Sequence, residues 1–358
     1  MATFRKIGIL SSGGDAPGMN ACIKAVVHRA KEMGVEVIGI SNGYAGLING
    51  DLTQLTTHKV ANINGEGGTI LYSSRCPEFK TEQGMQTAIA TCRRNEIDAL
   101  ICIGGDGTFR GATDMTIRGI PSIGIPGTID NDIVATDYTI GFDTALNTTT
   151  YMIDNLRDTC ESHNRLDVVE VMGNRCGQIA LYSAIASGAV AVAIPELPFD
   201  EEAAIKRIAD LRRAGKRNMI VVVAEGKKNE DGTKYSELLA KKIPELTGVE
   251  TKFARLAHTV RGGRPTVRDR VSATRMGIAA VEALVAGKSN LVICERDTDI
   301  ETIDISLALA IQKLHHGNLK EEELASLSEE DRTFVKKIVA RRHNVTVQLY
   351  EAAADICM

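Results

Sequence analysis

Tryptophan is absent from this 358-residue chain, and aromatic residues make up only 4% of it. The scarcity of aromatic rings argues against a base-stacking RNA surface, and a net charge of -4 argues against a general nucleic-acid binder. No apolar run is long enough to span a membrane. The first residues, MATFRKIGIL, begin a strand pattern at once, so we expect no export signal and a cytoplasmic protein.

Paired cysteines are also missing. The eight cysteines are scattered and none forms a CxxC pair, which predicts buried free thiols rather than disulfides. Their positions are 22, 76, 92, 102, 160, 176, 294 and 357. The composition, 44% hydrophobic and 25% charged, is typical of a globular chain long enough for two domains.

Short apolar runs alternate with helical patterns along the chain, which predicts parallel sheets covered by helices on both faces. The fold class expected is therefore α/β, with two doubly wound Rossmann-like domains and an active site in the cleft between them. The expected strands are 6–10, 35–40, 98–105, 121–127, 166–173, 189–196, 218–226, 251–258 and 290–297, and a helical tail with an N-cap at Ser326 or Ser328 follows residue 318.

Two glycine-rich loops follow predicted strands. The segment SSGGDAPGMN (11–20) opens the first helix, where glycines and free N–H groups suit a phosphate, although a structural tight turn would have the same residues. It is neither GxGxxG nor GxxxxGK[ST]. The segment GGDGT (104–108) is a second glycine-rich loop after a predicted strand. Asp106 between its glycines suggests a ligand of Mg²⁺ that bridges nucleotide phosphates, although it could also be an aspartate of a structural turn.

The segment TIDND (128–132) follows the next strand and cannot fill a core. Asp130 and Asp132 lie on one side of an extended segment, so one carboxylate could accept a proton from an attacking hydroxyl while the other orients it. Thr128 joins the same face as a neutral donor. Such close carboxylates need cations near them to remain ionised, which Mg²⁺ and arginines would supply.

Isolated arginines complete the set of candidate phosphate ligands. Arg75, Arg165, Arg261 and Arg270 have no obvious helical pairing and suit phosphate recognition, although each alone could be a surface ion-pair partner. Glu225, at the end of a strand, could accept hydrogen bonds from a polyol or simply be solvated there.

Together, the segments GGDAPGMN, GGDGT, PGTIDND, GFDTA, VVEVMG and RGG followed by DR resemble the bacterial ATP-dependent 6-phosphofructokinases, in order over residues 5 to about 300. The resemblance implies the phosphofructokinase fold, a homotetramer, and transfer of the ATP γ-phosphoryl, with Mg²⁺, to the 1-hydroxyl of fructose 6-phosphate. It also implies a nucleotide-binding domain (1–140 plus 252–303), a sugar-phosphate-binding domain (141–251) and a helical C-terminal segment (304–358) packing on the second domain.

On the matching positions, the resemblance implies that Asp130 is the general base, Asp132 its partner, and Thr128 the group holding the hydroxyl. Gly14 and Arg75 would stabilise the phosphoryl in transit, and Arg165 and Arg261 would reach a neighbouring subunit's site. The other implied contacts are Cys76, Gly105, Gly107 and Thr108 for ATP, Asp106 for Mg²⁺, and Ile129, Met172, Gly173, Asn174, Glu225, Arg268 and Arg270 for the sugar phosphate.

The phosphoryl donor is indicated by two glycines. Pyrophosphate-dependent relatives carry Asp and Lys where this chain has Gly107 and Gly127, and a side chain at 107 would occupy room that a nucleoside needs, so the sequence favours ATP. A pyrophosphate-dependent or differently selective sugar-phosphate kinase, and a catalytically weak effector-binding paralogue, remain the alternatives.

The chain departs from the family at several positions. Tyr72 stands where most members have Gly, Asn174 where they have Arg (Arg175 could substitute), and Val260 where they usually have Gln. The basic pocket that binds ADP or phosphoenolpyruvate in the family is depleted of charge, so we expect a weak effector response. The residues at its positions are Lys24, His28, Thr57, Arg157, Val190, Ala214 and Lys216.

Overall fold

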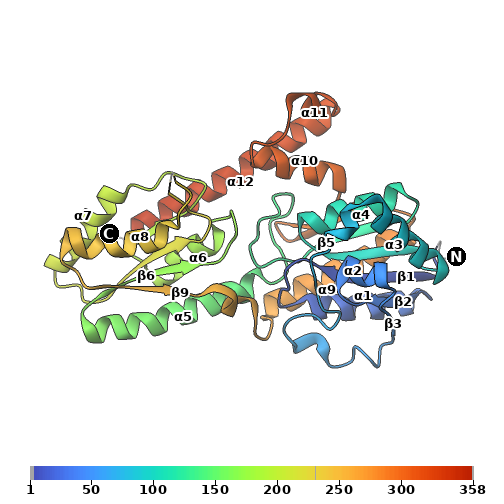
Figure 1. Cartoon of the computed structure of the whole chain (residues 1–358), viewed down its shortest axis with the longest axis horizontal. Coiled ribbons are helices and arrows are strands. Elements are labelled where there is room, and N and C mark those ends of the chain that lie inside the picture. Colours follow the sequence, from blue (N-terminus) through green and yellow to red (C-terminus); the bar gives the residue numbers. More distant parts are fainter. Residues whose placement is uncertain (1–3, 230, 357–358) are drawn as a thin grey trace. The chain divides into compact units, whose positions relative to one another are not determined.

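The computed structural model describes residues 4–229 and 231–356, and the contacts between them divide the chain into two compact units. Unit 1 runs to Ile129 and also contains residues 133–144 and 261–340. Unit 2 contains residues 130–132, residues 145–260 and the chain from Arg341 onward. The elements of both units are labelled in Figure 1.

Unit 1 is built on a seven-stranded sheet with the order β11-β10-β5-β4-β1-β2-β3. The five inner strands are parallel, whereas β3 and β11 pair antiparallel at the two edges. Every residue of β4, ALICIG, is buried, as expected for a strand covered on both faces. The strands are β1 (Lys6–Ser12), β2 (Glu36–Ile40), β3 (Leu52–Leu55), β4 (Ala99–Gly104), β5 (Ser122–Pro126), β10 (Leu291–Arg296) and β11 (Asp299–Asp304).

Helices cover both faces of this sheet. One face carries α1 (Met19–Glu32) and α9 (Val267–Val285), which lie side by side in Figure 1. The other face holds a hydrophobic cluster in which Tyr44, Phe79, Phe109 and Met115 pack together. The elements on this face are α2 (Gly43–Asn49), α3 (Glu82–Arg94), α4 (Asp106–Ile117), α10 (Ile305–His315) and the short helix η2 (Glu78–Lys80). The short helix η1 (Ile63–Gly65) lies instead against α1.

Three loops leave this sheet at the same level. Ser12 at the end of β1 is the register partner of Gly104 at the end of β4, which in turn pairs with Pro126 at the end of β5. The strand order reverses between β1 and β4, and ligands of doubly wound sheets bind at the carboxyl ends of strands at such a switch point. The segments 11–20, 104–108 and 126–129 therefore begin side by side at the ligand-binding edge of unit 1.

Unit 2 has a four-stranded, fully parallel sheet with the order β7-β8-β6-β9. Val171 of β6 is the register partner of Ala224 of β8, so the segments that follow these two strands also start at one level. The elements are α5 (Phe142–His163, whose first residues belong to unit 1), β6 (Leu166–Val171), α6 (Gln178–Ser187), β7 (Ala191–Ala193), α7 (Glu201–Arg213), β8 (Met219–Ala224), α8 (Tyr235–Thr247), β9 (Thr251–Arg255) and η3 (Ala257–Arg261, whose last residue belongs to unit 1).

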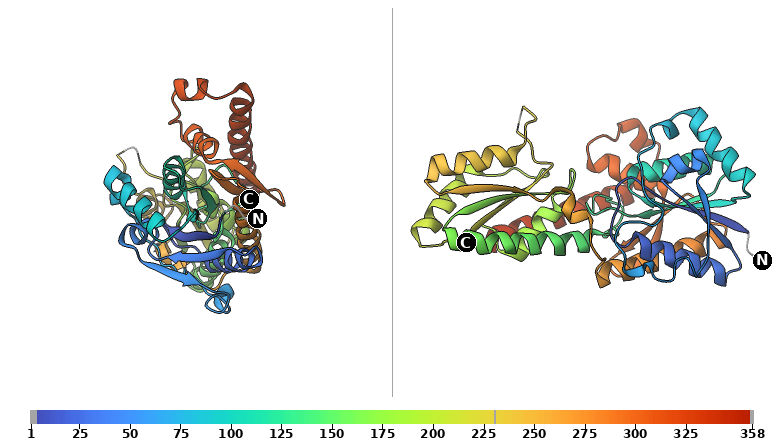
Figure 2. Two further views of the ribbon diagram at one scale, coloured as in Figure 1. Left: turned by 90° about the vertical axis from the view of Figure 1, so that its right-hand side faces the viewer. Right: turned by 60° about the horizontal axis from the view of Figure 1, so that its bottom comes forward.

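The C-terminal segment differs from the prediction. Residues 304–340 belong to unit 1, because Ile311, Val335 and Ile338 pack in the same cluster as Phe109, so the expectation that all of 304–358 packs on the second domain is wrong. Residues 252–260, predicted in the nucleotide domain, belong to unit 2 because β9 pairs with β6. The tail contains α11 (Glu321–Ala325) and α12 (Glu329–Ile356), and α12, red in the left view of Figure 2, is one unbroken helix.

The cap of α12 follows the prediction. Ser328 Oγ accepts a hydrogen bond from the backbone N–H of Asp331 at 3.1 Å, so the N-cap is Ser328 and not Ser326. The seven cysteines within the described residues are free thiols, six of them buried, and Cys357 lies outside those residues. Among the described residues, no helix combines the length and the apolar character needed to cross a bilayer.

Candidate active site

The first loop of unit 1 exposes backbone at Gly13 and Gly14, directly after β1. An arginine of the same chain lies against it: Arg261 Nη1 donates to the carbonyl of Asp15 at 3.3 Å. A Cβ added at Gly14 would stand 2.7 Å from Arg261 Nη1, so the glycine allows the guanidinium to approach the backbone. The arrangement puts a cation beside a glycine-rich turn at the start of α1, which suits an anionic ligand.

The second loop leads from β4 into α4, whose first residue is Asp106. The side chain of Thr108 is buried, and its Oγ1 donates to the carbonyl of Ser12 at 3.0 Å, which fixes the two loops to each other. The Thr108 hydroxyl therefore has a structural partner, and a ligand would meet the N-terminus of α4 rather than this hydroxyl. The dipole of a helix N-terminus favours phosphate.

The glycines of this region fall into two kinds. Gly104 and Gly127 are required by packing, because a Cβ on Gly104 would stand 2.4 Å from the Ser12 carbonyl oxygen and one on Gly127 would stand 2.8 Å from Ile103 Cγ2. A Cβ on Gly107 meets nothing within 4 Å, and one on Gly105 meets only Ile133 Cδ1 at 3.9 Å. The protein itself does not demand glycine at 105 and 107, so the space there is available to a ligand.

The third segment, residues 69–76, carries Arg75 and is attached to the first loop. Ser73 Oγ donates to the carbonyl of Gly13 at 2.6 Å, and Ser11 Oγ donates to that of Tyr72 at 2.8 Å. Tyr72 has φ 55°, a left-handed conformation that explains why glycine suits this position, and its side chain is 64% exposed. Arg75 is exposed and Cys76 half-buried beside these contacts.

The TIDND segment is divided between the two units after Ile129. Thr128 is half-buried, and its carbonyl accepts from Thr139 Oγ1 at 2.6 Å. The side chain of Ile129 is fully buried, so only its backbone can contact a ligand. Asp130 and Asn131 are buried in unit 2, where Asn131 has φ 48° and its Nδ2 donates to Gln178 Oε1 at 2.6 Å.

In unit 2, Asn174 touches a predicted catalytic carboxylate. Its Nδ2 donates to Asp132 Oδ2 at 3.3 Å, and its backbone N–H donates to Glu225 Oε1 at 2.9 Å. The side chain that stands in place of the family's arginine is thus a neutral amide hydrogen-bonded to Asp132. Met172 and Gly173 are buried beneath it, and Arg175 is exposed. Arg165 lies half-buried at the start of β6, where its Nη2 donates to Thr159 Oγ1 at 3.1 Å.

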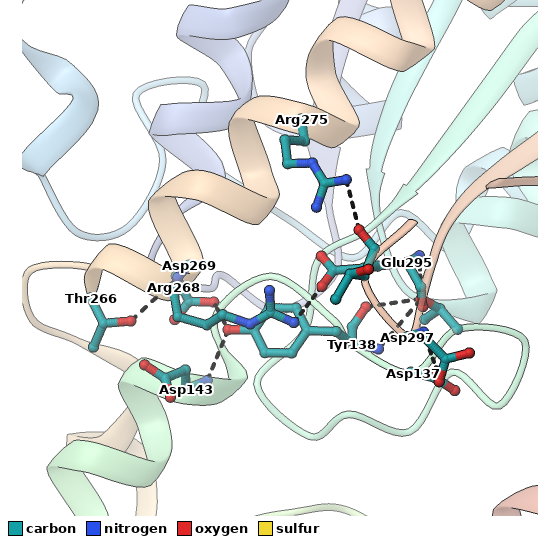
Figure 3. Close-up of polar contacts among 11 residues, drawn as sticks. Asp137, Tyr138, Asp143, Thr266, Arg268, Asp269, Arg275, Glu295 and Asp297 are labelled. Carbon is teal, nitrogen blue, oxygen red and sulfur yellow. Dashed lines mark hydrogen bonds and ion pairs between the residues drawn. The ribbon is translucent and has the colours of Figure 1, made fainter. Parts of the chain in front are cut away.

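Arg268, predicted as a sugar-phosphate contact, is engaged elsewhere in unit 1. Figure 3 shows its guanidinium bonded to the fully buried carboxylate of Glu295 and placed over the ring of Tyr138, 4.3 Å from the ring centroid. The backbone of Glu295 is bonded as well, since its N–H donates to Thr136 Oγ1 at 2.9 Å. These contacts make Arg268 a structural partner of the segment that follows TIDND.

Asp269, beside Arg268 in Figure 3, fixes the same segment. Its buried carboxylate accepts hydrogen bonds from Tyr138 Oη and Gly141 N at 2.6 Å each and from Thr144 N at 2.8 Å. Burial raises the pKa of Asp269, and the hydrogen bonds from Thr144 and Tyr138 oppose that rise. Arg268 and Asp269 together hold residues 136–144 in place.

Two further positions differ in what they can contact. Arg270 is half-buried in unit 1, with its Nε donating to the carbonyl of Pro265 at 2.8 Å and its Nη1 3.5 Å from the place of a Cβ on Gly65. It remains a candidate phosphate ligand. Val260 is fully buried, so at this departure from the family the side chain packs in the interior.

One buried cation was missed by sequence reasoning. Arg342 of α12 donates through Nη2 to the backbone carbonyl of Asn131 within unit 2. A signal for it exists in the sequence, because Arg342 continues the buried stripe formed by Val335, Ile338 and Thr346 at helical spacing. A charged residue on an apolar stripe indicates a specific partner.

No group of three or more His, Cys, Asp or Glu side chains that could hold a metal occurs within residues 4–229 and 231–356. Asp106, half-buried in the first turn of α4 beside the open glycines, nevertheless fits Mg²⁺. Magnesium is commonly bound by one or two carboxylates together with substrate phosphates, and does not need an all-protein cage.

The mixed sheet of unit 1, with glycine-rich loops at its switch point, and the parallel sheet of unit 2 place the chain among the two-unit, doubly wound α/β proteins. The family model described as Phosphofructokinase matches residues 6–284. The chain belongs to the phosphofructokinase family.

Relatives share this sequence over most of its length. The ATP-dependent 6-phosphofructokinase 1 of Clostridium perfringens (strain 13 / Type A) is 48% identical over 318 residues, which cover 89% of this chain and 98% of that protein. The ATP-dependent 6-phosphofructokinase of Clostridium botulinum (strain Loch Maree / Type A3) is 48% identical over 310 residues, 87% of this chain and 95% of that protein.

Solved structures confirm the predicted fold. Phosphofructokinase from Saccharomyces cerevisiae superposes with a TM-score of 0.82 at 29% identity, over 92% of this chain and 48% of that one. Pichia pastoris phosphofructokinase in the T-state gives the same TM-score at 33% identity, over 95% of this chain and 39% of that one. The chain thus spans about half or less of the length of these yeast chains.

Proposed function

We propose that this chain transfers the γ-phosphoryl group of MgATP to the 1-hydroxyl of D-fructose 6-phosphate, giving fructose 1,6-bisphosphate and ADP in glycolysis. The observation that carries the proposal is the register of the unit-1 sheet. Ser12, Gly104 and Pro126 are register partners on neighbouring strands, so the three loops that follow them begin next to one another. The names of the two Clostridium relatives, both ATP-dependent 6-phosphofructokinases, supply the substrate class.

In this mechanism the chain contributes positioning and charge. Backbone N–H groups of the loops 11–20 and 104–108 bind the nucleotide phosphates, and Arg75 offsets charge on the group in transit. Asp130 accepts the proton of the attacking hydroxyl, while Thr128 holds that hydroxyl and Asp132 orients the base. Met172, Gly173 and Glu225 contact the sugar, and Arg165, Arg261 and Arg270 bind its phosphate.

Asp106 is the residue that would hold Mg²⁺. An ion held there would neutralise charge on the nucleotide phosphates. Asp106 fits this role because it stands at the N-terminus of α4 between the two glycines whose Cβ positions are open. One carboxylate would be enough, because phosphate oxygens and water complete the ligand set of Mg²⁺ in such sites.

A coupled assay of fructose 1,6-bisphosphate formation, with ATP or with pyrophosphate as donor, tests the proposal. We expect turnover with ATP and fructose 6-phosphate in the presence of Mg²⁺, and little with pyrophosphate. Turnover with pyrophosphate alone would favour the pyrophosphate-dependent alternative. Absence of turnover with both donors would favour a catalytically weak effector-binding paralogue.

If ATP is the phosphoryl donor, a charged side chain at residue 107 should lower kcat/KM for ATP. A Gly107→Asp substitution should fold normally, because its Cβ meets nothing within 4 Å. Its carboxylate would repel the nucleotide phosphates, so kcat/KM for ATP should fall about 100-fold or more. Steady-state kinetics at varied ATP measures this, with Gly107→Ala as the uncharged control, expected to lose less than about tenfold. Unchanged kinetics in Gly107→Asp would contradict ATP binding at this loop.

The effector response is expected to be weak. Lys24 Nζ donates to the Ala61 carbonyl at 2.7 Å and Arg157 donates to the Ser187 carbonyl, so a diphosphate would have to compete for both cations. Val190 is buried and carries no charge. Velocity at low fructose 6-phosphate, with and without ADP or phosphoenolpyruvate, should change less than about twofold. Sigmoidal kinetics relieved by ADP would show that an effector site is present.

The assembly and the location complete the proposal. A homotetramer with Arg165 and Arg261 reaching a neighbouring subunit's site is proposed from the family resemblance. Within the single chain, Arg261 lies on its own Asp15 carbonyl, so the neighbour would have to draw it away from that contact. A glycolytic role implies a cytoplasmic enzyme that binds neither nucleic acid nor membrane.

A further inference from the structure

We propose that Arg342 of α12 is a positioning residue for the catalytic aspartates: it fixes the backbone between Asp130 and Asp132 and places a positive charge beside them. This inference rests on the proposed function, because it presupposes that these aspartates act on the sugar hydroxyl. Arg342 lies beyond residues 6–284, which the family model matches.

The burial of Arg342 requires an explanation. Its side chain belongs to a residue only 9% exposed, and no other Lys or Arg among the described residues is buried. Removing a guanidinium from water is costly unless it is paired and hydrogen-bonded. A buried arginine on the apolar stripe of an amphipathic helix therefore indicates that specific partners compensate for it.

The partners of Arg342 converge on one residue. Its Nη2 donates to the Asn131 carbonyl, and the same nitrogen lies 3.9 Å from Cys176 Sγ. Cys176 Sγ in turn lies 3.8 Å from the Asn131 carbonyl oxygen. Asn131 is therefore held at its carbonyl by α12, and through its side-chain amide by Gln178 at the start of α6.

This clamp acts where the direction of the aspartates is set. The Asn131 carbonyl belongs to the peptide plane that joins Asn131 to Asp132, and Asn131 has the uncommon φ of 48°. Fixing this plane fixes the backbone N and Cα of Asp132, the atoms from which its side chain starts. The Asp132 carboxylate is then met by Asn174 Nδ2 at 3.3 Å.

The charge of Arg342 also affects the pKa values of two neighbouring groups of unit 2, the Cys176 thiol and the Glu196 carboxyl. Burial raises the pKa of the Cys176 thiol to about 12, and Arg342 opposes that rise while Glu196 and Asp132 add to it. Burial likewise raises the pKa of Glu196, against which Arg342 again acts. The guanidinium on the Asn131 carbonyl therefore adds positive charge to the part of unit 2 that carries Asp130 and Asp132.

The test is steady-state kinetics of the full chain with MgATP and fructose 6-phosphate, together with calorimetric binding of fructose 6-phosphate and a melting curve. For Arg342→Met we expect kcat to fall about 10- to 100-fold, with KM for ATP and the Kd of fructose 6-phosphate changed less than about threefold. Arg342→Lys, which keeps the charge, should recover at least part of kcat. The control Lys337→Met removes an exposed cation from the same helix and should behave as wild type.

Two outcomes would overturn the inference. One is a wild-type kcat in Arg342→Met. The other is an equal loss of kcat, sugar-phosphate binding and melting temperature in both Arg342→Met and Arg342→Lys, which would give the residue a purely structural role. A wild-type chain without turnover would instead overturn the proposed function, and the inference with it.

Discussion

An Asp130→Ser variant is expected to lose most of its turnover while it still binds fructose 6-phosphate. A positioned general base contributes about 10²- to 10⁴-fold to such reactions, so kcat should fall by that factor. The substitution removes a carboxylate that is buried in unit 2 and leaves the arginines that would bind the sugar phosphate intact. The Kd of fructose 6-phosphate, measured by calorimetry, should therefore change less than about threefold.

The control for this variant is Asp158→Ser, which removes an exposed aspartate of α5 in the same unit. It should leave kcat unchanged within about twofold, as expected for an exposed position away from the site. Turnover of Asp130→Ser at the wild-type rate would refute the assignment of the base. A parallel loss of sugar-phosphate binding would mean that Asp130 mainly shapes the binding site.

The second large effect concerns stability. Arg268→Met should destabilise the protein by about 2–4 kcal/mol, somewhat less than the roughly 3–5 kcal/mol for breaking a fully buried pair, because Arg268 is partly exposed. The cause is Glu295, whose carboxylate is fully buried and whose Oε2 already has no hydrogen-bond partner among the described residues. The melting temperature should fall by roughly 5–12 °C in differential scanning calorimetry.

Two companion variants separate this explanation from a role in substrate binding. The double variant Arg268→Met, Glu295→Gln should recover much of the lost stability, since it removes the uncompensated charge. Arg275→Met, on the same helix and bonded to the Thr298 carbonyl at 2.7 Å, should cost less than about 1 kcal/mol. If Arg268→Met kept its melting temperature and instead raised KM for fructose 6-phosphate tenfold, the original prediction of a substrate contact would stand.

Much of the fold could be predicted because the inner strands are unambiguous. Runs such as ALICIG in β4 and MIVVVA in β8 are buried along their whole length, as expected for strands covered on both faces. The edge strands β3 and β11 were not predicted. Their sequences, LTQL and DIETID, carry exposed polar residues. Both strands form because they pair antiparallel with a neighbouring strand, and the local sequence does not show that pairing.

The parts of the candidate site that consist of short sequence motifs could be predicted. Glycine loops and the TIDND aspartates are recognised by residue type and by their place after strands. The contact between Arg342 and Asn131 joins residues 211 positions apart, and the pairing of Arg268 with Glu295 joins two elements of unit 1. Such pairings depend on which helix packs on which strand end, and an arginine side chain alone does not indicate whether it will meet a phosphate or a buried carboxylate.

The central claim is that the loops after β1 and β4 bind the phosphates of a nucleotide whose metal is held by Asp106. A crystal structure of the full chain with Mg²⁺, a non-hydrolysable ATP analogue and fructose 6-phosphate tests it most directly. The account predicts the γ-phosphate against the backbone N–H groups of residues 11–15 and 105–108, with Mg²⁺ bound by the Asp106 carboxylate. Phosphates bound elsewhere, or an Asp106 side chain turned to solvent without metal, would contradict it.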